Sequence, residues 1–195
     1  MKIGIETLEG VGLVAALEAA ARLRIDVFRS FPYLYEGSLA YEHDYLSKFS
    51  SAAGAILVVA RDGDGIVGAA TACPLEAEHE AFKAPLRDAG LDLSGIYYCA
   101  ESVLLPQYRG QGIGHAFFDA REAKARALGF HRIAFCGVVR PYDHPLRPAG
   151  FRPLDPFWRK RGYAPVDGAV ARFSWRDVGE ADQTEKPLQF WMRDL

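Results

Sequence analysis

The strongest local pattern in the chain is Ile96-Tyr-Tyr-Cys-Ala-Glu-Ser-Val-Leu-Leu-Pro-Gln-Tyr-Arg-Gly-Gln-Gly-Ile-Gly114. An apolar run to Leu105 predicts a buried strand, Pro106 follows, and glycines at 110, 112 and 114 lead into an alanine-rich segment with helical spacing. Glycines let several main-chain amides approach a phosphate, and the positive end of a helix dipole adds to that attraction. The pattern therefore predicts a phosphate-binding turn. The alternative is a turn that is rich in glycine for steric reasons alone.

Strand patterns and helix patterns alternate on both sides of this stretch. Because a helix from about 113 to 128 separates two apolar runs, 96–105 and 132–139, these two strands are expected to be parallel. The remaining predicted elements are a strand at 2–8, helices at 11–29 and 38–50, a hairpin at 55–73, a helix at 76–88, a proline-rich connection at 140–156, a helix at 157–161, and strands at 169–175 and 188–192.

Length and composition predict one globular domain over residues 1–195. Half of the residues are hydrophobic, a quarter are charged, and the formal net charge is −2, which argues against nucleic acid as a partner. The apolar stretch at 11–17 is too short to span a membrane, and the three cysteines match no metal-ligand spacing. We expect a cytoplasmic protein without a metal or a membrane partner. A homodimer is one option for the assembly.

Two familiar phosphate-binding loops do not fit the glycine-rich turn. It lacks the Gly-Lys-Ser/Thr ending of a nucleoside triphosphate loop, and it begins near residue 107 rather than in an opening dinucleotide-binding unit.

Residues 102–114 instead resemble the acyl-CoA-binding motif of the GCN5-related N-acetyltransferases, written Arg/Gln-x-x-Gly-x-Gly/Ala after a strand and a proline. Gln107, Gly110 and Gly112 occupy its defining positions. The segment Phe157-Trp-Arg-Lys-Arg-Gly-Tyr163 is similar to the later aromatic-Tyr-x-x-x-Gly-Phe segment of that family. The order of elements matches over nearly the whole chain. The resemblance implies an α/β fold with a mixed, mostly antiparallel six- or seven-stranded sheet, in which the strands at 96–105 and 132–139 splay apart between flanking helices.

The resemblance also implies a co-substrate, acetyl-CoA. Its pantetheine arm would pair with main-chain groups of Ser102, Val103 and Leu104. Its pyrophosphate would be bound by the amides of Arg109, Gly110, Gln111, Gly112, Ile113, Gly114 and His115.

In such an enzyme the acceptor amine attacks the thioester directly, so the site needs a base. Glu101 is the candidate, because it is a carboxylate in an otherwise uncharged strand and burial there would help it accept a proton. The alternative is a salt-bridged glutamate, for example with an arginine of the proline-rich segment. Trp158 stands at the position of the family's usual tyrosine acid, and an indole does not replace a phenol as a proton donor. The substitutes are Tyr98, Tyr142, His144 and Tyr163, or release of the thiolate to solvent.

Candidate acceptor-binding residues lie in two connecting segments. Tyr33, Tyr35 and Glu36 separate the first two predicted helices, where related enzymes build part of the acceptor wall, although such aromatic residues also serve as core plugs. The proline-rich segment contributes Arg140, with His144, Arg147 and Arg152 as further basic groups for an acidic acceptor or the 3′-phosphate of CoA, or as partners in internal salt bridges. Cys99 and Cys136 are interpreted as core residues rather than nucleophiles.

These features predict an N-acetyltransferase that acts on a primary amine of a small molecule or peptide. The alternative function is a CoA-binding sensor or regulatory module that has lost the chemistry, and Trp158 is the departure that favours it.

Overall fold

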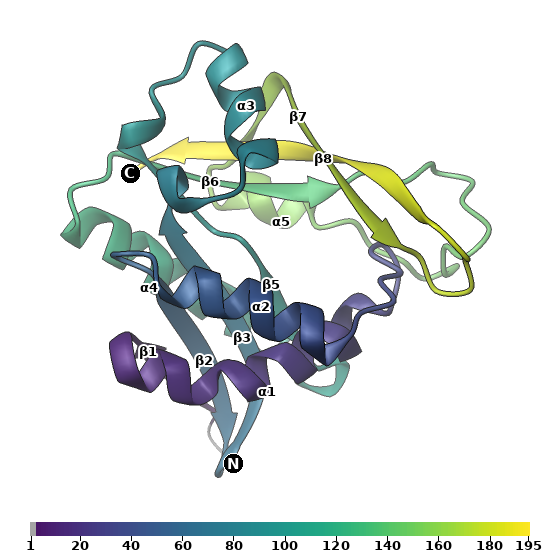
Figure 1. The fold of residues 1–195 in the computed structure, drawn as a ribbon, viewed down its shortest axis with the longest axis horizontal. Helices are drawn as coiled ribbons and strands as arrows, with labels where there is room; N and C mark the ends of the chain where they lie inside the picture. The colour runs from purple at the N-terminus through teal and green to yellow at the C-terminus, as the bar shows by residue number, and fades with distance from the viewer. Residues whose placement is uncertain (1–2) are drawn as a thin grey trace.

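The computed structural model describes residues 3–195, which form an eight-stranded mixed sheet with helices on both faces (Figure 1). One half of the sheet consists of β1 (Gly4–Leu8), β2 (Ile56–Asp62) and β3 (Gly65–Pro74), paired antiparallel in chain order. Lys2, the first residue of the predicted opening strand, lies outside the described residues.

The other half contains β4 (Ile96–Tyr98), β6 (Arg132–Val138), β8 (Gln183–Asp194) and β7 (Ala164–Arg176). The strand order is β1-β2-β3-β4-β6-β8-β7, and the pair β4–β6 is parallel whereas its neighbours are antiparallel. The predicted mixed, mostly antiparallel sheet with a central parallel pair is confirmed. The last two strands are longer than predicted, because polar residues alternate with apolar ones at both ends of the hairpin.

The predicted single strand at 96–105 is divided in two, which raises the strand number to eight. Its second part, β5 (Ser102–Leu104), pairs with β3 alone. Tyr98 and Ser102 are four residues apart, whereas their partners on β3, Cys73 and Ala70, are three apart. One extra residue on one strand is a β-bulge, which bends the strand and increases its twist. The bulge therefore turns the chain away from β6, an effect that the run of apolar residues did not indicate.

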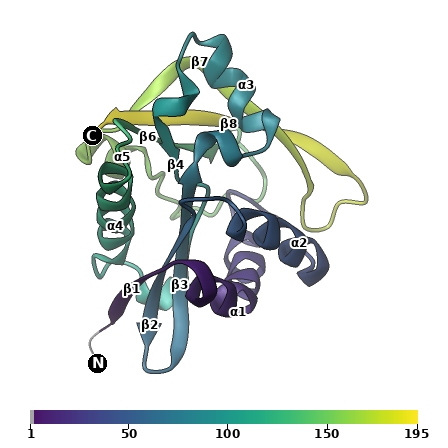
Figure 2. The same cartoon turned by 60° about the vertical axis from the view of Figure 1, so that its left-hand side comes forward.

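The helices form a layer on each face of the sheet. The helices α1 (Gly10–Phe28) and α2 (Leu39–Ser50) cover one face of β2 and β3, and α4 (Ile113–Ala127) covers the other, with α5 (Asp155–Lys160) beside it (Figure 2). The helix α3 (Glu80–Asp88) packs against β7 and begins later than predicted, after a 3₁₀ turn at Leu75–Ala77. No helix within residues 3–195 combines the length and the apolar character needed to cross a membrane.

The strands β2 and β3 are buried on both faces because each face has its own core. Ile56, Val58 and Ala60 pack toward α4, and the alternate residues Leu57 and Val59 pack toward α1 and α2. This alternation is the period of two that a strand imposes on its side chains. Burying one such side chain stabilises the fold by about 1.5–3 kcal/mol, so the central strands form a rigid support for the residues that follow β5.

The turn between β7 and β8 reaches the loop between α1 and α2. Tyr35 forms a bridge with Asp177, the amide of Val178 donates to the carbonyl of Leu34 at 2.6 Å, and that of Glu36 donates to Arg176 at 2.9 Å. These main-chain bonds hold the α1–α2 loop at the edge of the second half of the sheet, far from its own helices in sequence pairing but close to β6 and β8.

Candidate active site

The main-chain groups of β5 face away from β6 along an edge without a ladder. The parallel pairing of β4 with β6 extends from Ile96↔Arg132 to Tyr98↔Ala134, and the amide of Cys99 adds one more bond, to Ala134, at 2.8 Å. Beyond that point, within residues 3–195, β5 pairs with β3 and β6 pairs with β8. The two central strands therefore diverge as predicted, and the free edge of Ser102–Leu104 can accept an extended ligand as if it were a strand.

The bulge is held in place from two directions. The carbonyl oxygen of Glu101 accepts a hydrogen bond from the amide of Thr71 on β3 and one from Nη1 of Arg121 on α4, both at 3.1 Å. Arg121 is 1% exposed and also donates from Nε to the carbonyl of Phe117 at 3.1 Å. A buried guanidinium that binds main-chain oxygens of both α4 and the bulge couples the start of β5 to the helix that follows the glycine-rich turn.

The glycine-rich turn leads from β5 to the N-terminus of α4 through a 3₁₀ turn at Pro106–Tyr108. Gly110 and Gly112 have φ angles of 77° and 81°, which other residues adopt only with strain. Gly112 is the N-cap of α4 and supplies no side-chain acceptor, so the amides of the first helical turn are left to other partners. These amides, together with the helix dipole, form a site suited to a phosphate group.

The side chains around this turn leave its outer surface open. A Cβ atom at Gly110 or Gly112 would meet no other atom within 4 Å. Arg109 and Gln111 are exposed and donate to carbonyls of the preceding segment, those of Leu104 and Gln107. Nδ1 of His115 lies 3.0 Å from Nη1 of Arg161, and Ile113 is buried, so only its main chain can contact a ligand.

Glu101 projects its carboxylate to the opposite side, toward α1 and α2. Its Oε2 lies 2.7 Å from Nη1 of Arg24 and accepts a hydrogen bond from Tyr45 at 3.1 Å, whereas its Oε1 is buried without a hydrogen-bond partner among residues 3–195. Nε of Arg24 donates to Glu42, which is fully buried. Burial favours the neutral form of Arg24, but the charges of Glu101 and Glu42 outweigh it and raise its pKa. Glu101 is thus salt-bridged, to an arginine of α1 rather than to one of the proline-rich segment.

The α1–α2 loop carries the predicted acceptor residues. The ring of Tyr33 stacks on Trp175 with centroids 6.1 Å apart, and burial raises the pKa of its phenol, with the neighbouring Cys136 and Glu101 contributing. Burial and the charge of Glu42 raise the pKa of Tyr35. Both phenols therefore stay neutral at physiological pH, and Tyr33 lies near the bulge and β6.

Glu36 and Arg140 are engaged within the protein. Glu36 lies 2.6 Å from Nη1 of Arg29. Arg140 donates to the carboxylate of Asp177 through both terminal nitrogens, at 2.8 and 2.9 Å, and to the carbonyls of Pro32 and Tyr33. Its guanidinium thereby joins the proline-rich segment, the β7–β8 turn and the α1–α2 loop.

The rest of the proline-rich segment packs around one arginine. The guanidinium carbon of Arg147 lies 4.8–5.9 Å from the ring centroids of Phe31, Tyr142 and Phe151. The ring of His144 packs 5.6 Å from that of Phe31. The segment forms an aromatic cluster on the α1–α2 loop.

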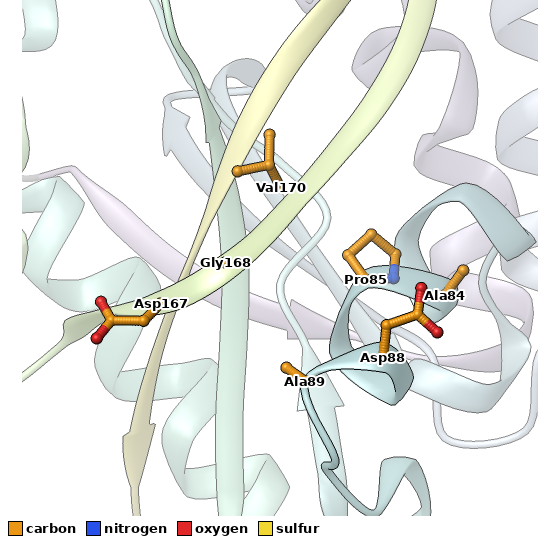
Figure 3. A pocket seen from close by; sticks show the side chains of 7 residues that line it. All are labelled: Ala84, Pro85, Asp88, Ala89, Asp167, Gly168 and Val170. Atoms are coloured by element: carbon orange, nitrogen blue, oxygen red, sulfur yellow. The ribbon is translucent and has the colours of Figure 1, made fainter.

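A separate pocket lies between α3 and β7 (Figure 3). None of the site residues predicted from the sequence lines it. Its lining residues are Ala84, Pro85, Asp88, Ala89, Asp167, Gly168 and Val170.

Comparison with known proteins places this geometry in a family. The model of the acetyltransferase (GNAT) family matches residues 17–149, which is more than half of the chain and includes the bulge, β5 and the glycine-rich turn. The chain belongs to the GNAT acetyltransferase family. A search of curated proteins found no significant match.

Solved GNAT structures share the fold over nearly the full length. A ribosomal-protein-alanine N-acetyltransferase from Brucella melitensis has 16% identity, covers 97% of this chain and 99% of its own, and superposes with a TM-score of 0.63. A GCN5-related N-acetyltransferase from Kribbella flavida has 16% identity, coverage of 99% and 98%, and a TM-score of 0.58. A phosphinothricin acetyltransferase from Sinorhizobium meliloti, in complex with AcCoA, has 17% identity, coverage of 98% and 88%, and a TM-score of 0.58.

Trp158, at the position of the usual GNAT tyrosine, is a packing residue in this structure. Its ring lies 4.9 Å from that of Phe135 and 5.1 Å from that of Trp191. A Cβ atom on Gly137 of β6 would lie 2.9 Å from the indole, so the strand carries a glycine where the ring covers it. The indole therefore occupies the β6 side of the diverging strands.

The substitutes for the missing GNAT acid differ in their surroundings. Tyr142 is 84% exposed on the proline-rich segment. Tyr163 is buried and donates to Glu122 at 3.0 Å, and burial raises its pKa. Tyr98 is buried beside Sγ of Cys136, at 3.0 Å, and burial raises its pKa well above normal. The cysteines are free and buried, and burial raises the pKa of Cys99 to about 11 and that of Cys136 to about 12, as expected for core residues.

Four residues near the bulge were not singled out from the sequence: Arg24, Tyr45, Glu78 and Arg121. One signal was available for the first of them. Glu42 falls on the apolar side of the second helix, and a buried carboxylate requires a partner of opposite charge. Similarly, Arg121 follows Phe117 by one helical turn on the apolar side of α4. A charged residue at a core-facing helical position was the pattern that could have revealed both.

Proposed function

We propose that this GNAT protein transfers the acetyl group of acetyl-CoA to a primary amine of a small molecule or peptide. The observation that carries the proposal is the continuity of two features: the unpaired edge of β5 runs directly into the Gly112-capped N-terminus of α4. An extended pantetheine arm and a pyrophosphate are joined in the same order in CoA. The S. meliloti neighbour, which holds AcCoA, supports the same ligand for this chain.

In this proposal main-chain groups of Ser102, Val103 and Leu104 bind the pantetheine arm. The amides from Arg109 to His115 bind the pyrophosphate. Most of these contacts are to main-chain atoms, so the shape and the φ angles of the turn matter more than its side chains.

The reaction proceeds by direct attack in a ternary complex. The amine nitrogen forms a bond to the acyl carbon, the C–S bond breaks, and CoA leaves as a thiolate that takes its proton from solvent. We assign Glu101 as the base that removes the ammonium proton, through its Oε1. Supporting this role, Oε2 is held by Arg24 and Tyr45 whereas Oε1 is free of protein partners within residues 3–195.

The acceptor lies on the side of the sheet covered by α1 and α2, with Tyr33 and Tyr35 in its wall. Glu36 and Arg140 are given a supporting role, because their charged groups already bind Arg29 and Asp177.

The test is release of CoA thiol from acetyl-CoA with a panel of primary amines, together with calorimetry of CoA binding. An acetyltransferase releases thiol in the presence of at least one amine. A CoA-binding sensor, which Trp158 favours as the second candidate, binds CoA without turnover. Absence of CoA binding contradicts both functions.

A further inference from the structure

Carboxylates outnumber cations around the side chain of Glu101. Glu42 and Glu101 share one basic partner, Arg24. Glu78 has no salt bridge within residues 3–195, and it lies close enough for the charge of Glu101, added to burial, to raise its pKa. The remaining nearby cation, Arg121, contacts the carbonyl of Glu101 from the α4 side. Three carboxylates thus face two arginines, only one of which reaches a carboxylate.

One oxygen in this cluster lacks a partner. Oε1 of Glu101 is buried and receives no hydrogen bond from residues 3–195, although the side chain is only 6% exposed. An unsatisfied buried carboxylate oxygen costs free energy unless a donor, and preferably a cation, fills the position. The free oxygen and the surplus of negative charge call for the same ligand group, a positively charged donor.

The surroundings of this oxygen are aromatic and neutral. Tyr33 from the α1–α2 loop lies near both Glu101 and Cys136, and Tyr98 of β4 lies 3.0 Å from Sγ of Cys136. Burial raises the pKa of both phenols, which keeps them uncharged. The wall therefore matches an aromatic or apolar body better than a second charged group.

The basic residues that were candidates for an acidic acceptor are engaged elsewhere. Arg140 is neutralised by Asp177, with its terminal nitrogens at 2.8 and 2.9 Å from that carboxylate. Arg147 lies among three aromatic rings of its own segment and the α1–α2 loop. An acceptor carboxylate beside Glu101 would meet like charges without a compensating arginine.

We propose, on the basis of the acyltransferase function argued above, that the acceptor is a cationic amine with an uncharged, aromatic or apolar body. Its ammonium group binds at Oε1 of Glu101, and Glu78 acts as a second carboxylate that excludes amines with a carboxylate or phosphate next to the nitrogen. Glu78 is thereby a specificity-determining residue, distinct from the base.

Three acceptors that differ in one group test this inference: 2-phenylethylamine, phenylalanine and phenylalaninamide. We expect kcat/KM for 2-phenylethylamine and for phenylalaninamide to exceed that for phenylalanine by at least about tenfold, because two like charges a few Å apart in a partly buried site repel by more than 1.4 kcal/mol. The amide separates the effect of charge from that of size. Equal or better use of phenylalanine overturns the inference.

Glu78→Gln identifies the residue responsible, and Glu76→Gln, an exposed glutamate two residues away, is its matched control. The first variant should reduce the preference for 2-phenylethylamine over phenylalanine by about tenfold, whereas the control should leave it unchanged. Equal preferences in the two variants contradict the role of Glu78.

Calorimetry separates this inference from the acyltransferase function. In the presence of CoA, 2-phenylethylamine should bind at least tenfold more tightly than phenylalanine, whether or not thiol is released. Tighter binding without turnover supports the amine site and contradicts the transferase. Equal binding, or binding of neither at millimolar concentration, overturns the amine site.

Discussion

Nη1 of Arg24 on α1 lies 2.7 Å from Oε2 of Glu101 at the bulge, and Nε of the same arginine donates to Glu42 on α2. One guanidinium therefore joins both helices of this face to the residue that precedes β5. Because Glu42 is fully buried and Glu101 is 9% exposed, the arginine is the group that makes their burial tolerable.

Replacing this arginine should destabilise the protein strongly. Arg24→Met leaves two buried carboxylates without their cation, and we expect a loss of about 3–5 kcal/mol in the free energy of unfolding. Urea denaturation measures it. Arg22→Met, in the same helix but in an exposed pair with Glu18, should cost less than about 1 kcal/mol. Similar losses in the two variants would show that the buried cluster does not depend on Arg24.

A side chain on the cap of α4 should abolish CoA binding. Gly112→Glu forces a non-glycine residue to φ near 81° and places a carboxylate where we assign the pyrophosphate. Calorimetry with acetyl-CoA should show a loss of affinity of at least about 100-fold, since both shape and charge oppose the ligand.

The control for this variant is Gly63→Glu in the β2–β3 turn, where φ is 58° and a Cβ would also meet no atom within 4 Å. Both variants should lose stability through backbone strain, but only the change at Gly112 should affect CoA. Normal acetyl-CoA affinity in a folded Gly112→Glu protein would refute the assignment of the turn.

Removing the indole of Trp158 should leave the chemistry largely intact. Since an indole does not protonate a thiolate, and a thiol with a pKa near ~8.5 can be released without an acid, Trp158→Phe should keep kcat within about threefold. Steady-state thiol release measures kcat. Trp191→Phe, whose ring packs 5.1 Å away, is the control for lost packing. A large fall in kcat for Trp158→Phe alone, with CoA affinity unchanged, would assign the indole a role in the reaction.

Asp177 should make stability fall in acid. Burial opposes its ionisation, but hydrogen bonds from Arg140 and Lys186 outweigh burial and hold the pKa of this carboxyl below its usual value of about 3.8. A lowered folded-state pKa means that the stabilisation is fully present above the unfolded-state pKa and is lost as pH falls through the folded-state value.

The free energy of unfolding of the native protein should therefore decrease more steeply below about pH 4 than that of Asp177→Asn. Asp182→Asn, an exposed change in the same hairpin turn, should follow the native curve. Denaturation at several pH values compares the three proteins. Parallel curves for the native protein and Asp177→Asn would exclude this contact as a source of acid sensitivity.

The order of elements and the glycine-rich turn were predictable because they depend on local chemistry. Pro106 ends a strand, Gly110 and Gly112 supply positive φ angles, and apolar residues at helical spacing define α4. The likeness to the GNAT motif rested on the same residues, and the family match over 17–149 confirms it.

The division of 96–105 was less accessible to sequence reasoning. An apolar run gives the same pattern whether it is straight or bulged, and the bulge becomes apparent only when Tyr98 and Ser102 are aligned with their partners on β3. The buried arginines, Arg24 and Arg121, were overlooked because a basic residue in a helix is normally assigned to the solvent side.

The sequence by itself determined the family, the course of the chain and the position of the phosphate-binding turn, since each depends on residues that are neighbours along the chain. Only the tertiary structure decided the surroundings of the catalytic candidate. It paired Glu101 with Arg24 from 77 residues earlier, engaged Arg140 with Asp177, and packed Trp158 on Gly137. The reason is physical: the charge balance of a buried site is a sum over groups brought together by folding, and no local pattern along the chain records that sum.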